Sequence, residues 1–289
     1  MDGVLVIDKP AGMTSHDVVD RIRKTFDTRK VGHAGTLDPD ATGVLILGIG
    51  RATRFLAYSQ VAPKSYEAIA RFGITTTTQD ASGDIVHGSE AVPSEAEVRD
   101  ALEPFRGEIE QIPPMVSAVR IGGERLYKKA RRGEEIERPP RKVTISALEL
   151  RGFAAGEKPE ATFDVTCSGG TYVRTLVHDL GNALGCGAHL LRLRRTEAGG
   201  FTIDEALPLE KVSTASLRPL ADAVRQLQAR EPSVEEVDHI AHGRAIALEG
   251  AGDSSIEDGT LVAFVRGGDL LAVYRRDGAL LKPDRVVAS

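Results

Sequence analysis

The sequence predicts an α+β fold with a mixed, mostly antiparallel sheet, followed by a small β-rich domain. Strand and helix patterns mix along residues 1–229 without the strict strand–helix–strand alternation of a doubly wound parallel sheet. After Arg230 the pattern changes to short apolar strands separated by the turns Gly267–Gly268 and Asp277–Gly278. We therefore expect one domain over residues 1–229 and a second over residues 230–289.

Hydrophobic periodicity predicts the elements of the larger domain. Strands are expected at 4–7, 44–49, 65–72, 143–150 and 161–167. Helices are expected after Thr14 and Ser94, which each have an acidic capping partner three residues later, and over 175–184, which Gly185 closes. After Ser94, apolar residues at helical spacing reach Phe105. The segment 27–43 has glycine, proline and aspartate without a period, so a loop is expected.

Length and composition are those of a globular protein. The 289 residues allow one large domain or a large and a small one, and 41% apolar residues can bury a core. No apolar run approaches the ~18 residues of a membrane span, and the start lacks the features of a secretory signal. We expect a cytoplasmic protein without a membrane partner. Cys167 and Cys186 lack metal spacing, so reduced structural thiols are expected.

Charge is unevenly distributed along the chain. The net charge of −5 by itself argues weakly against a nucleic-acid partner. However, Arg125–Lys142 contains eight Lys/Arg and three Glu, and Arg192–Arg195 is a second basic cluster. Acidic residues gather elsewhere, for example at Glu231–Asp238. The electrostatic footprint must therefore be judged locally.

Asp38 is the first candidate for chemistry. It lies in "GTLDPDATG", where Pro39 restricts the backbone and glycines on both sides allow a ligand to approach. A carboxylate held in this way can be a nucleophile or a general base, whereas the alternative is an aspartate that only caps its own turn. His33 can be a base, a metal ligand or a loop residue, but no metal spacing accompanies it. Asp40 is expected to face solvent.

Arg174 and Tyr66 are the next candidates. Arg174, in "SGGTYVRT", can bind a carboxylate bidentately and lower its pKa by about 1–3 units. The alternative is a surface arginine, which would sit badly at the positive end of a helix. Tyr66 starts an alternating strand, so it is either a core residue or a platform for a planar ligand such as a base.

Several motifs together resemble one family. "LVIDKPAGMTSHDVV", "GHAGTLDPDATGVL", "KSYEAIARFG", "PPMVSAVRIGGERLY" and "SGGTYVRTLVHDLG", in this order, resemble the bacterial TruB family of tRNA pseudouridine-55 synthases. The resemblance implies conversion of uridine 55 in the tRNA T arm to pseudouridine, without cofactor or metal. It also implies a pseudouridine synthase core with an inserted RNA-binding thumb, here at about 120–142, and a PUA-like domain at the C-terminal end.

The resemblance also implies roles for individual residues. Asp38 matches the catalytic aspartate, Tyr66 the tyrosine that stacks on the target base, and Arg174 the arginine that pairs with the aspartate. Tyr172 lies beside the base, His33 enters the T loop, Leu193 contacts the uracil, and Asp80 lines the cleft. The thumb would bind RNA through Arg125, Lys128, Lys129, Arg131 and Arg132. Val116, Arg120 and Ala34 depart from the family pattern without removing a catalytic group.

Three other functions fit these residues less well. A glycosidase needs a second, acid-form carboxylate, for which only Asp40 or Asp80 is available. A non-catalytic RNA-binding protein is disfavoured because Asp38, Tyr66 and Arg174 are all present. A guide-RNA-dependent relative would carry longer basic extensions, which this chain lacks. We therefore expect a monomer that acts on the T stem-loop of tRNA without a guide RNA.

Overall fold

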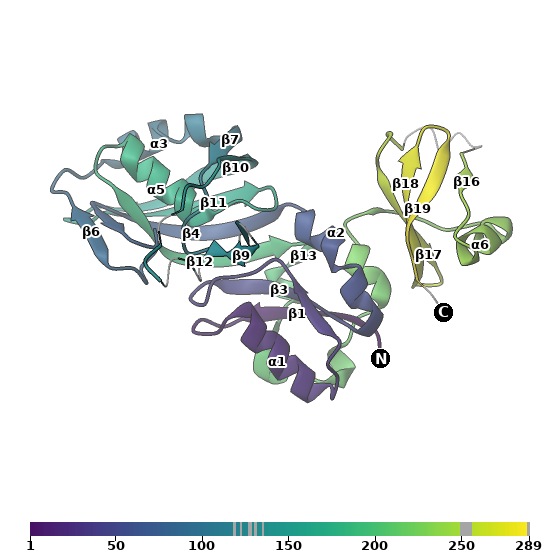
Figure 1. The fold of residues 1–289 in the computed structure, drawn as a ribbon. Coiled ribbons are helices and arrows are strands. Elements are labelled where there is room, and N and C mark those ends of the chain that lie inside the picture. The colour runs from purple at the N-terminus through teal and green to yellow at the C-terminus, as the bar shows by residue number, and fades with distance from the viewer. Residues whose placement is uncertain are drawn as a thin grey trace.

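The computed structural model describes residues 1–117, 120–121, 123–126, 129, 132–134, 136–248 and 256–287. Its main feature is a ten-stranded mixed sheet whose principal order is β14-β1-β3-β12-β4-β11-β10-β7 (Figure 1). Among the described strands of this sheet, only the β1–β14 and β3–β12 pairs are parallel, which confirms a mostly antiparallel sheet. A second sheet of five strands follows in the order β15-β17-β18-β19-β16.

The elements have the following bounds. The main sheet contains β1 (Gly3–Lys9), β2 (Val31–Ala34), β3 (Thr42–Ile49), β4 (Lys64–Phe72), β7 (Gly107–Gln111), β10 (Arg141–Ala154), β11 (Glu160–Cys167), β12 (Ala188–Ala198), β13 (Phe201–Thr202) and β14 (Leu207–Pro208). The second sheet contains β15 (Gln228–Arg230), β16 (Ile246–Ala247), β17 (Leu261–Arg266), β18 (Asp269–Asp277) and β19 (Leu280–Val286). Two hairpins pair β5 (Ile74–Thr76) with β6 (Ile85–Gly88) and β8 (Arg120–Ile121) with β9 (Glu124–Arg125). The α-helices in the described ranges are α1 (Ser15–Thr25), α2 (Leu56–Val61), α3 (Glu95–Asp100), α5 (Val173–Ala183) and α6 (Val234–Ala241).

The expected capping boxes are present. Thr14 and Asp17 cap α1 reciprocally, and Ser94 and Glu97 do the same for α3. Two expectations were wrong. The segment 27–43 contains β2, which pairs with β3 along its whole length, because tertiary pairing overrides a weak local pattern. The helix after Ser94 ends at Asp100 and gives way to a short 3₁₀ turn that contains Pro104, whose ring cannot continue an α-helix.

The core lies on both faces of the main sheet. The apolar face of α1 (Val18, Val19 and Ile22) and that of α5 belong to one buried cluster with the inward residues of β3, β4 and β11. In β4 the residues from Lys64 to Phe72 alternate between buried and partly exposed positions, as the sequence predicts. This packing fixes the strand ends and loops that carry the polar residues described below.

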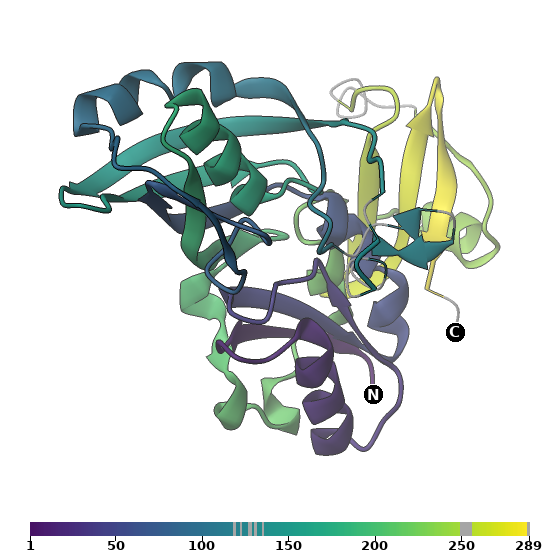
Figure 2. The ribbon, with the colours of Figure 1, turned by 60° about the vertical axis from the view of Figure 1, so that its left-hand side comes forward.

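The C-terminal sheet is docked on the rest of the chain. A single apolar cluster includes Val6, Phe55 and Val224 from the first part of the chain together with Leu270 and Val273 from β18. The short helix α2 lies between the two sheets (Figure 1). In Figure 2 the yellow C-terminal strands stand directly beside the blue segment that contains α2. The two sheets therefore form one packed body. No described helix has the length and apolar character needed to cross a membrane.

Candidate active site

Asp38 lies on the short connection between β2 and β3, and the residue before it is anchored by a buried hydroxyl. Ser15, in the first turn of α1, is 2% exposed. Its hydroxyl oxygen accepts from the Leu37 N–H at 2.8 Å and lies 3.1 Å from the Leu37 carbonyl oxygen. Both backbone groups of Leu37 are thereby held, so the backbone that enters Asp38 is fixed against α1.

Lys9 anchors the residue after the aspartate. Its side chain has no exposed surface, and its ammonium group donates to the carbonyls of Pro10, Met13 and Pro39 at 2.9, 2.6 and 2.9 Å. Burial lowers the pKa of Lys9 to about 8, although Asp40 and Asp38 oppose the shift. Three acceptors match the three N–H donors of an ammonium group, so the buried charge is fully hydrogen-bonded.

Arg174, near the start of α5, joins two aspartates. One terminal nitrogen lies 3.0 and 3.2 Å from the two carboxylate oxygens of Asp38, and the other lies 3.1 Å from an oxygen of Asp80. The arginine side chain is only 6% exposed. The bidentate pair with Asp38 alone, which the sequence suggested, is not formed, because the second arm of the guanidinium serves Asp80.

The pKa of Asp38 is raised above its ordinary value of 3.8. Burial is the first cause, Arg174 opposes it, and Asp80 raises the pKa further. The expected lowering was therefore wrong in direction, because it counted the arginine but neither the desolvation nor the second aspartate. The carboxyl group is crowded by protein atoms, yet 46% of the side-chain surface remains open, so a substrate can reach it.

Asp80 is oriented by its own loop, between β5 and β6. One carboxylate oxygen accepts from the Thr78 hydroxyl at 2.6 Å and from the Ser82 hydroxyl and N–H at 2.6 and 3.0 Å. Its second oxygen is the one that faces Arg174. Asp80 thus holds the guanidinium in place, and the guanidinium in turn faces Asp38.

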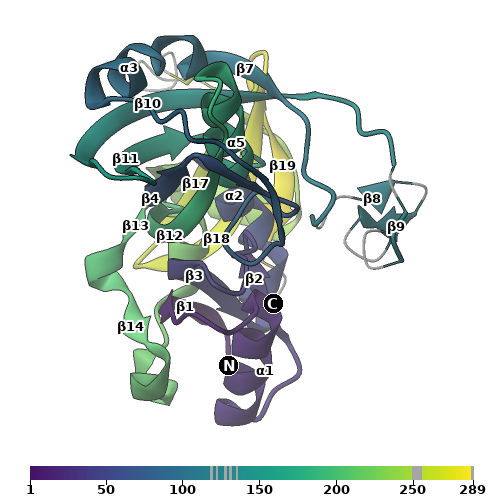
Figure 3. The same ribbon diagram turned by 90° about the vertical axis from the view of Figure 1, so that its left-hand side faces the viewer.

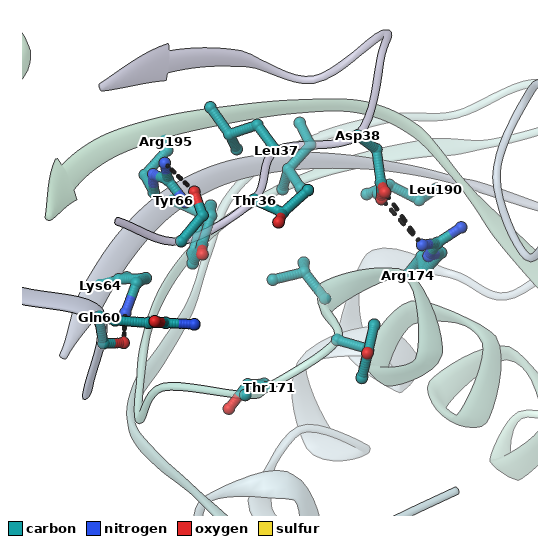
Figure 4. A pocket seen from close by; sticks show the side chains of 15 residues that line it. Thr36, Leu37, Asp38, Gln60, Lys64, Tyr66, Thr171, Arg174, Leu190 and Arg195 are labelled. Carbon is teal, nitrogen blue, oxygen red and sulfur yellow. Dashed lines mark hydrogen bonds and ion pairs between the residues drawn. The ribbon is translucent and has the colours of Figure 1, made fainter. Parts of the chain in front are cut away.

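A cavity of about 240 Å³ opens beside this ion network. In Figure 4, Asp38 and Arg174 lie at one side and Lys64 and Gln60 at the opposite side. The remaining lining residues are Gly35, Thr36, Leu37, Tyr66, Gly170, Thr171, Tyr172, Val173, Leu190, Leu193 and Arg195. The volume and the mixture of apolar and polar walls are suitable for a single planar base with part of its sugar.

Tyr66 and Arg195 form one wall of this cavity. Arg195 is 1% exposed and donates to the carbonyls of Val44 and Gly35 at 2.7 and 3.1 Å. It also donates to the Tyr66 hydroxyl (Figure 4). Burial raises the pKa of Tyr66, so the hydroxyl is protonated at neutral pH. The tyrosine ring is therefore held rigidly against the cavity.

Tyr172 is held through its backbone. The side-chain amide of Gln111, 2% exposed at the end of β7, accepts from the Tyr172 N–H at 3.0 Å and donates to its carbonyl at 3.2 Å. Burial also raises the pKa of the Tyr172 hydroxyl. The turn before α5 is thereby fixed, and with it the position of Arg174 two residues later.

A second cavity, of about 220 Å³, borders the same ion network. It shares Asp38, Arg174, Leu190 and Leu193 with the first cavity, and its further lining residues include Asp80 and Val116. Five of the seven predicted substrate-site residues (Asp38, Tyr66, Tyr172, Arg174 and Leu193) line the first cavity, and Asp80 lines the second. His33 lies on β2 opposite Leu47 and lines neither.

The basic segment expected to be the thumb contains the β8–β9 hairpin, which stands away from the main sheet (Figure 3). Arg132 is exposed there and binds two carboxylates, those of Glu124 at 2.8 Å and Glu134 at 2.6 Å. Lys128 and Arg131 lie outside the described residues, as does the side chain of Arg125. Lys129 is partly exposed.

Sequence reasoning assigned no role to Lys64, Lys9 or Arg195. For two of them, the alternation of side chains along a strand could have indicated a role. Lys64 lies on the same strand face as Tyr66, and Arg195 lies on the same face as Leu193. No sequence pattern indicated a role for Lys9, since a lysine beside a proline normally lies on the surface. Both cysteines are buried and free. Within the described ranges, no three His, Cys, Asp or Glu side chains gather as metal ligands.

Solved structures with a similar fold include Cbf5 complexes and an H/ACA RNP. The chain superposes on one titled "Crystal Structure of a Cbf5-Nop10-Gar1 Complex" with a TM-score of 0.75 and 27% identity, covering 98% of this chain and 84% of that one. A structure of an H/ACA RNP bound to a substrate RNA containing 2′-deoxyuridine gives a TM-score of 0.73 and 26% identity, over 99% and 85% of the two chains. The fold is that of the pseudouridine synthases, enzymes that isomerise uridine.

Sequence comparison identifies the family. Residues 23–173 match the model described as "TruB family pseudouridylate synthase (N terminal domain)", and residues 174–229 match "tRNA pseudouridylate synthase B C-terminal domain". Proteins named tRNA pseudouridine synthase B are similar over nearly their whole length. That of Arthrobacter sp. (strain FB24) is 43% identical over 100% of this chain and 97% of its own, and that of Syntrophotalea carbinolica is 44% identical over 94% and 91%. The chain belongs to the TruB family.

Proposed function

We propose that this chain converts uridine 55 in the T arm of tRNA to pseudouridine, with Asp38 as the catalytic carboxylate. One observation carries the proposal. A carboxylate that is fixed on both sides by buried groups and paired with a buried arginine opens into a cavity the size of one nucleoside. Names of relatives similar over the whole chain support tRNA as the substrate.

The reaction is an isomerisation in which atoms balance within the substrate. The bond from uracil N1 to ribose C1′ breaks, the base turns, and a bond from C5 to C1′ forms. C5 loses a proton and N1 carries one in the product. Because nothing is oxidised or reduced, the reaction requires no redox cofactor, and we propose that it proceeds without a metal. The Asp38 carboxylate can start this sequence by attack on C1′, by addition to C6 or by removal of the ribose 2′ proton.

The cavity walls suit a base that has left its stack. Flipping a nucleotide out of a folded loop costs a few kcal/mol, which stacking and exclusion of water must offset. Tyr66, held by Arg195, offers a planar face, and Leu193 offers an apolar contact. Tyr172 lies on the turn that leads to Arg174. His33, outside both cavities, would enter the T loop and fill space left by the flipped base.

We assign roles to the two remaining segments from their positions in the sequence. The segment 120–142, with Arg125, Lys128, Lys129, Arg131 and Arg132, would contact the tRNA backbone as a thumb. Residues 230–289 would form a PUA-like domain after the catalytic domain at 1–229. We propose a monomer that needs no guide RNA, because relatives over 40% identical are named as tRNA enzymes, whereas the structures titled as Cbf5 complexes are only 26–27% identical.

Tritium release from tRNA transcripts with 5-tritiated uridine tests the proposal. One transcript carries uridine at position 55 and its control carries cytidine there, and neither reaction contains a second RNA. We expect tritium release from the first transcript alone. A metal chelator should not change this release, and the Asp38→Asn substitution should abolish it. Asp38→Asn is expected to bind tRNA nearly as well as the unaltered protein, since it keeps the shape of the side chain.

Other outcomes contradict specific parts of the proposal. Release from both transcripts would contradict the choice of position 55. Normal turnover by Asp38→Asn would exclude Asp38 as the catalytic group. Activity only after a guide RNA is added would favour the type of particle seen in the H/ACA RNP structure.

A further inference from the structure

A hydrogen bond connects the C-terminal sheet to α2. Tyr58, on α2 and 8% exposed, donates its hydroxyl to the carboxylate of Asp284 on β19. Burial first, and then the bond to Asp284, raise the pKa of Tyr58 to about 12. Asp284 also accepts from Arg275 of β18 at 3.2 Å. The contact is therefore a partly buried polar link between the C-terminal sheet and α2.

The opposite end of α2 touches the cavity. The Lys64 ammonium group, on a side chain 6% exposed, donates to the carbonyls of Gln60 and Ala62 at 2.7 and 2.8 Å. Gln60 and Lys64 are both lining residues (Figure 4). A side chain at Gly169 would lie 2.9 Å from the Gln60 carbonyl oxygen, so the turn before Tyr172 packs directly on the end of α2.

Lys64 then contacts the wall that holds Tyr66. A β-carbon at Gly35 would lie 3.2 Å from Lys64 Cε and 3.4 Å from an Arg195 nitrogen, so these two cations flank one glycine. Arg195 in turn donates to the Tyr66 hydroxyl. A continuous series of contacts therefore connects Asp284, α2, Lys64 and the tyrosine wall of the cavity.

We propose that the C-terminal sheet positions the catalytic cavity through α2, with the Tyr58–Asp284 hydrogen bond as the link, so that Tyr58 and Asp284 are positioning residues for the reaction. This inference rests on the proposed function, since it takes the cavity as the site of pseudouridine formation. The six-residue helix α2 has no side-chain cap at its start, where Phe55 is the N-cap residue, which leaves docking as the main constraint on this short helix.

The test compares rates at saturating RNA in the full-length protein. Tyr58→Phe and Asp284→Ala each remove the bond, whereas Asp284→Asn keeps an acceptor for the tyrosine. We expect the first two to lower kcat about fivefold, the factor that corresponds to one net hydrogen bond of about 1 kcal/mol, with KM changed less than about twofold. Asp284→Asn should retain most of the activity, and the double variant Tyr58→Phe/Asp284→Ala should be no slower than either single variant.

Controls separate positioning from simple loss of folding. Arg275→Gln removes the other partner of Asp284 and leaves the link intact, so its kcat should be unchanged. All rates are measured under conditions in which circular dichroism shows that each variant is folded. Additive losses in the double variant, or an unchanged kcat in Tyr58→Phe, would overturn the inference. An inactive parent protein would instead contradict the proposed function, so the two failures are distinguishable.

Discussion

The charges around Asp38 and the charges of the 120–142 segment are arranged in opposite ways. Around Asp38 the cations are buried: Lys9, Arg174 and Arg195 are all at most 6% exposed in their side chains or as whole residues, and each has carbonyl or carboxylate partners. In the 120–142 segment Arg132 is 48% exposed, and its partners are two glutamates whose side chains are 36% and 43% exposed.

The difference follows from what solvent does to charge. Buried ion pairs and charged hydrogen bonds are weakly screened and geometrically fixed, which suits the stabilisation of a reacting centre. Exposed pairs are screened by salt and contribute about 0–1 kcal/mol, which suits a surface that exchanges its partners for phosphates. The comparison predicts large, salt-independent effects from the first group and small, salt-dependent ones from the second.

Among changes to the charged groups around Asp38, the largest effect is expected from Arg174→Lys. A lysine cannot reach two carboxylates with a planar fork, so the orientation of Asp38 is lost and kcat should fall about 10²-fold. Asp80→Asn keeps the size of the second partner but removes its charge, and it should cost less, about tenfold. Single-turnover kinetics at saturating tRNA measures both, and equal losses would contradict the separate roles given to the two contacts.

Lys9→Met is expected to affect stability as well as activity. Three carbonyls lose their donor, so the free energy of unfolding should fall by about 2–4 kcal/mol and kcat by about tenfold, because Pro39 is released. Urea denaturation measures the first effect. Lys30→Met, at an exposed position, is a matched control and should leave stability unchanged.

The stability difference should also depend on pH. Because the pKa of Lys9 is lowered from 10.5 to about 8, the folded protein binds fewer protons than the unfolded chain between these values. The contribution of Lys9 to stability should therefore rise with pH above 8. A difference from Lys9→Met that is flat between pH 7 and 10 would show that the ammonium group is not buried in solution.

Charge removal in the 120–142 segment should weaken binding without stopping chemistry. Replacing Lys128, Lys129, Arg131 and Arg132 by glutamine should raise the Kd for tRNA about tenfold and flatten its salt dependence. Arg132→Gln alone should do little, since two glutamates already partner it, whereas Glu124→Gln/Glu134→Gln should tighten binding. Filter binding at several salt concentrations measures the slope, and an unchanged slope in the fourfold variant would place the RNA elsewhere.

The smallest effect is expected from Asp38→Asn on thermal stability. A carboxyl whose pKa is raised by folding stabilises the protein at low pH and loses that contribution as pH rises through the folded value. The asparagine variant should therefore melt about 1–3 °C higher at pH 7, with no difference near pH 3.5. Calorimetry at the two pH values measures this, and a lower melting temperature at pH 7 would mean that the ion pair with Arg174 outweighs burial.

Much of the fold was predictable because local patterns and tertiary contacts agree. The capping boxes at Thr14 and Ser94, the alternation of β4 and the glycine turns of the C-terminal sheet all have short-range causes. β2 was missed because its four residues have no period of their own and become a strand only by pairing with β3. The predicted helix after Ser94 was too long, because apolar residues continue at helical spacing to Phe105 although Pro104 cannot continue an α-helix.

The sequence by itself determined the residue types of the site, the loop that carries Asp38 and the family to which the chain belongs, because motifs keep their order along the chain. Only the tertiary structure decided how the charges are shared. It divided Arg174 between Asp38 and Asp80, buried Lys9 under the Asp38 loop and raised the pKa of Asp38. Desolvation and long-range pairing depend on which surfaces meet when the chain folds, and no local pattern encodes them.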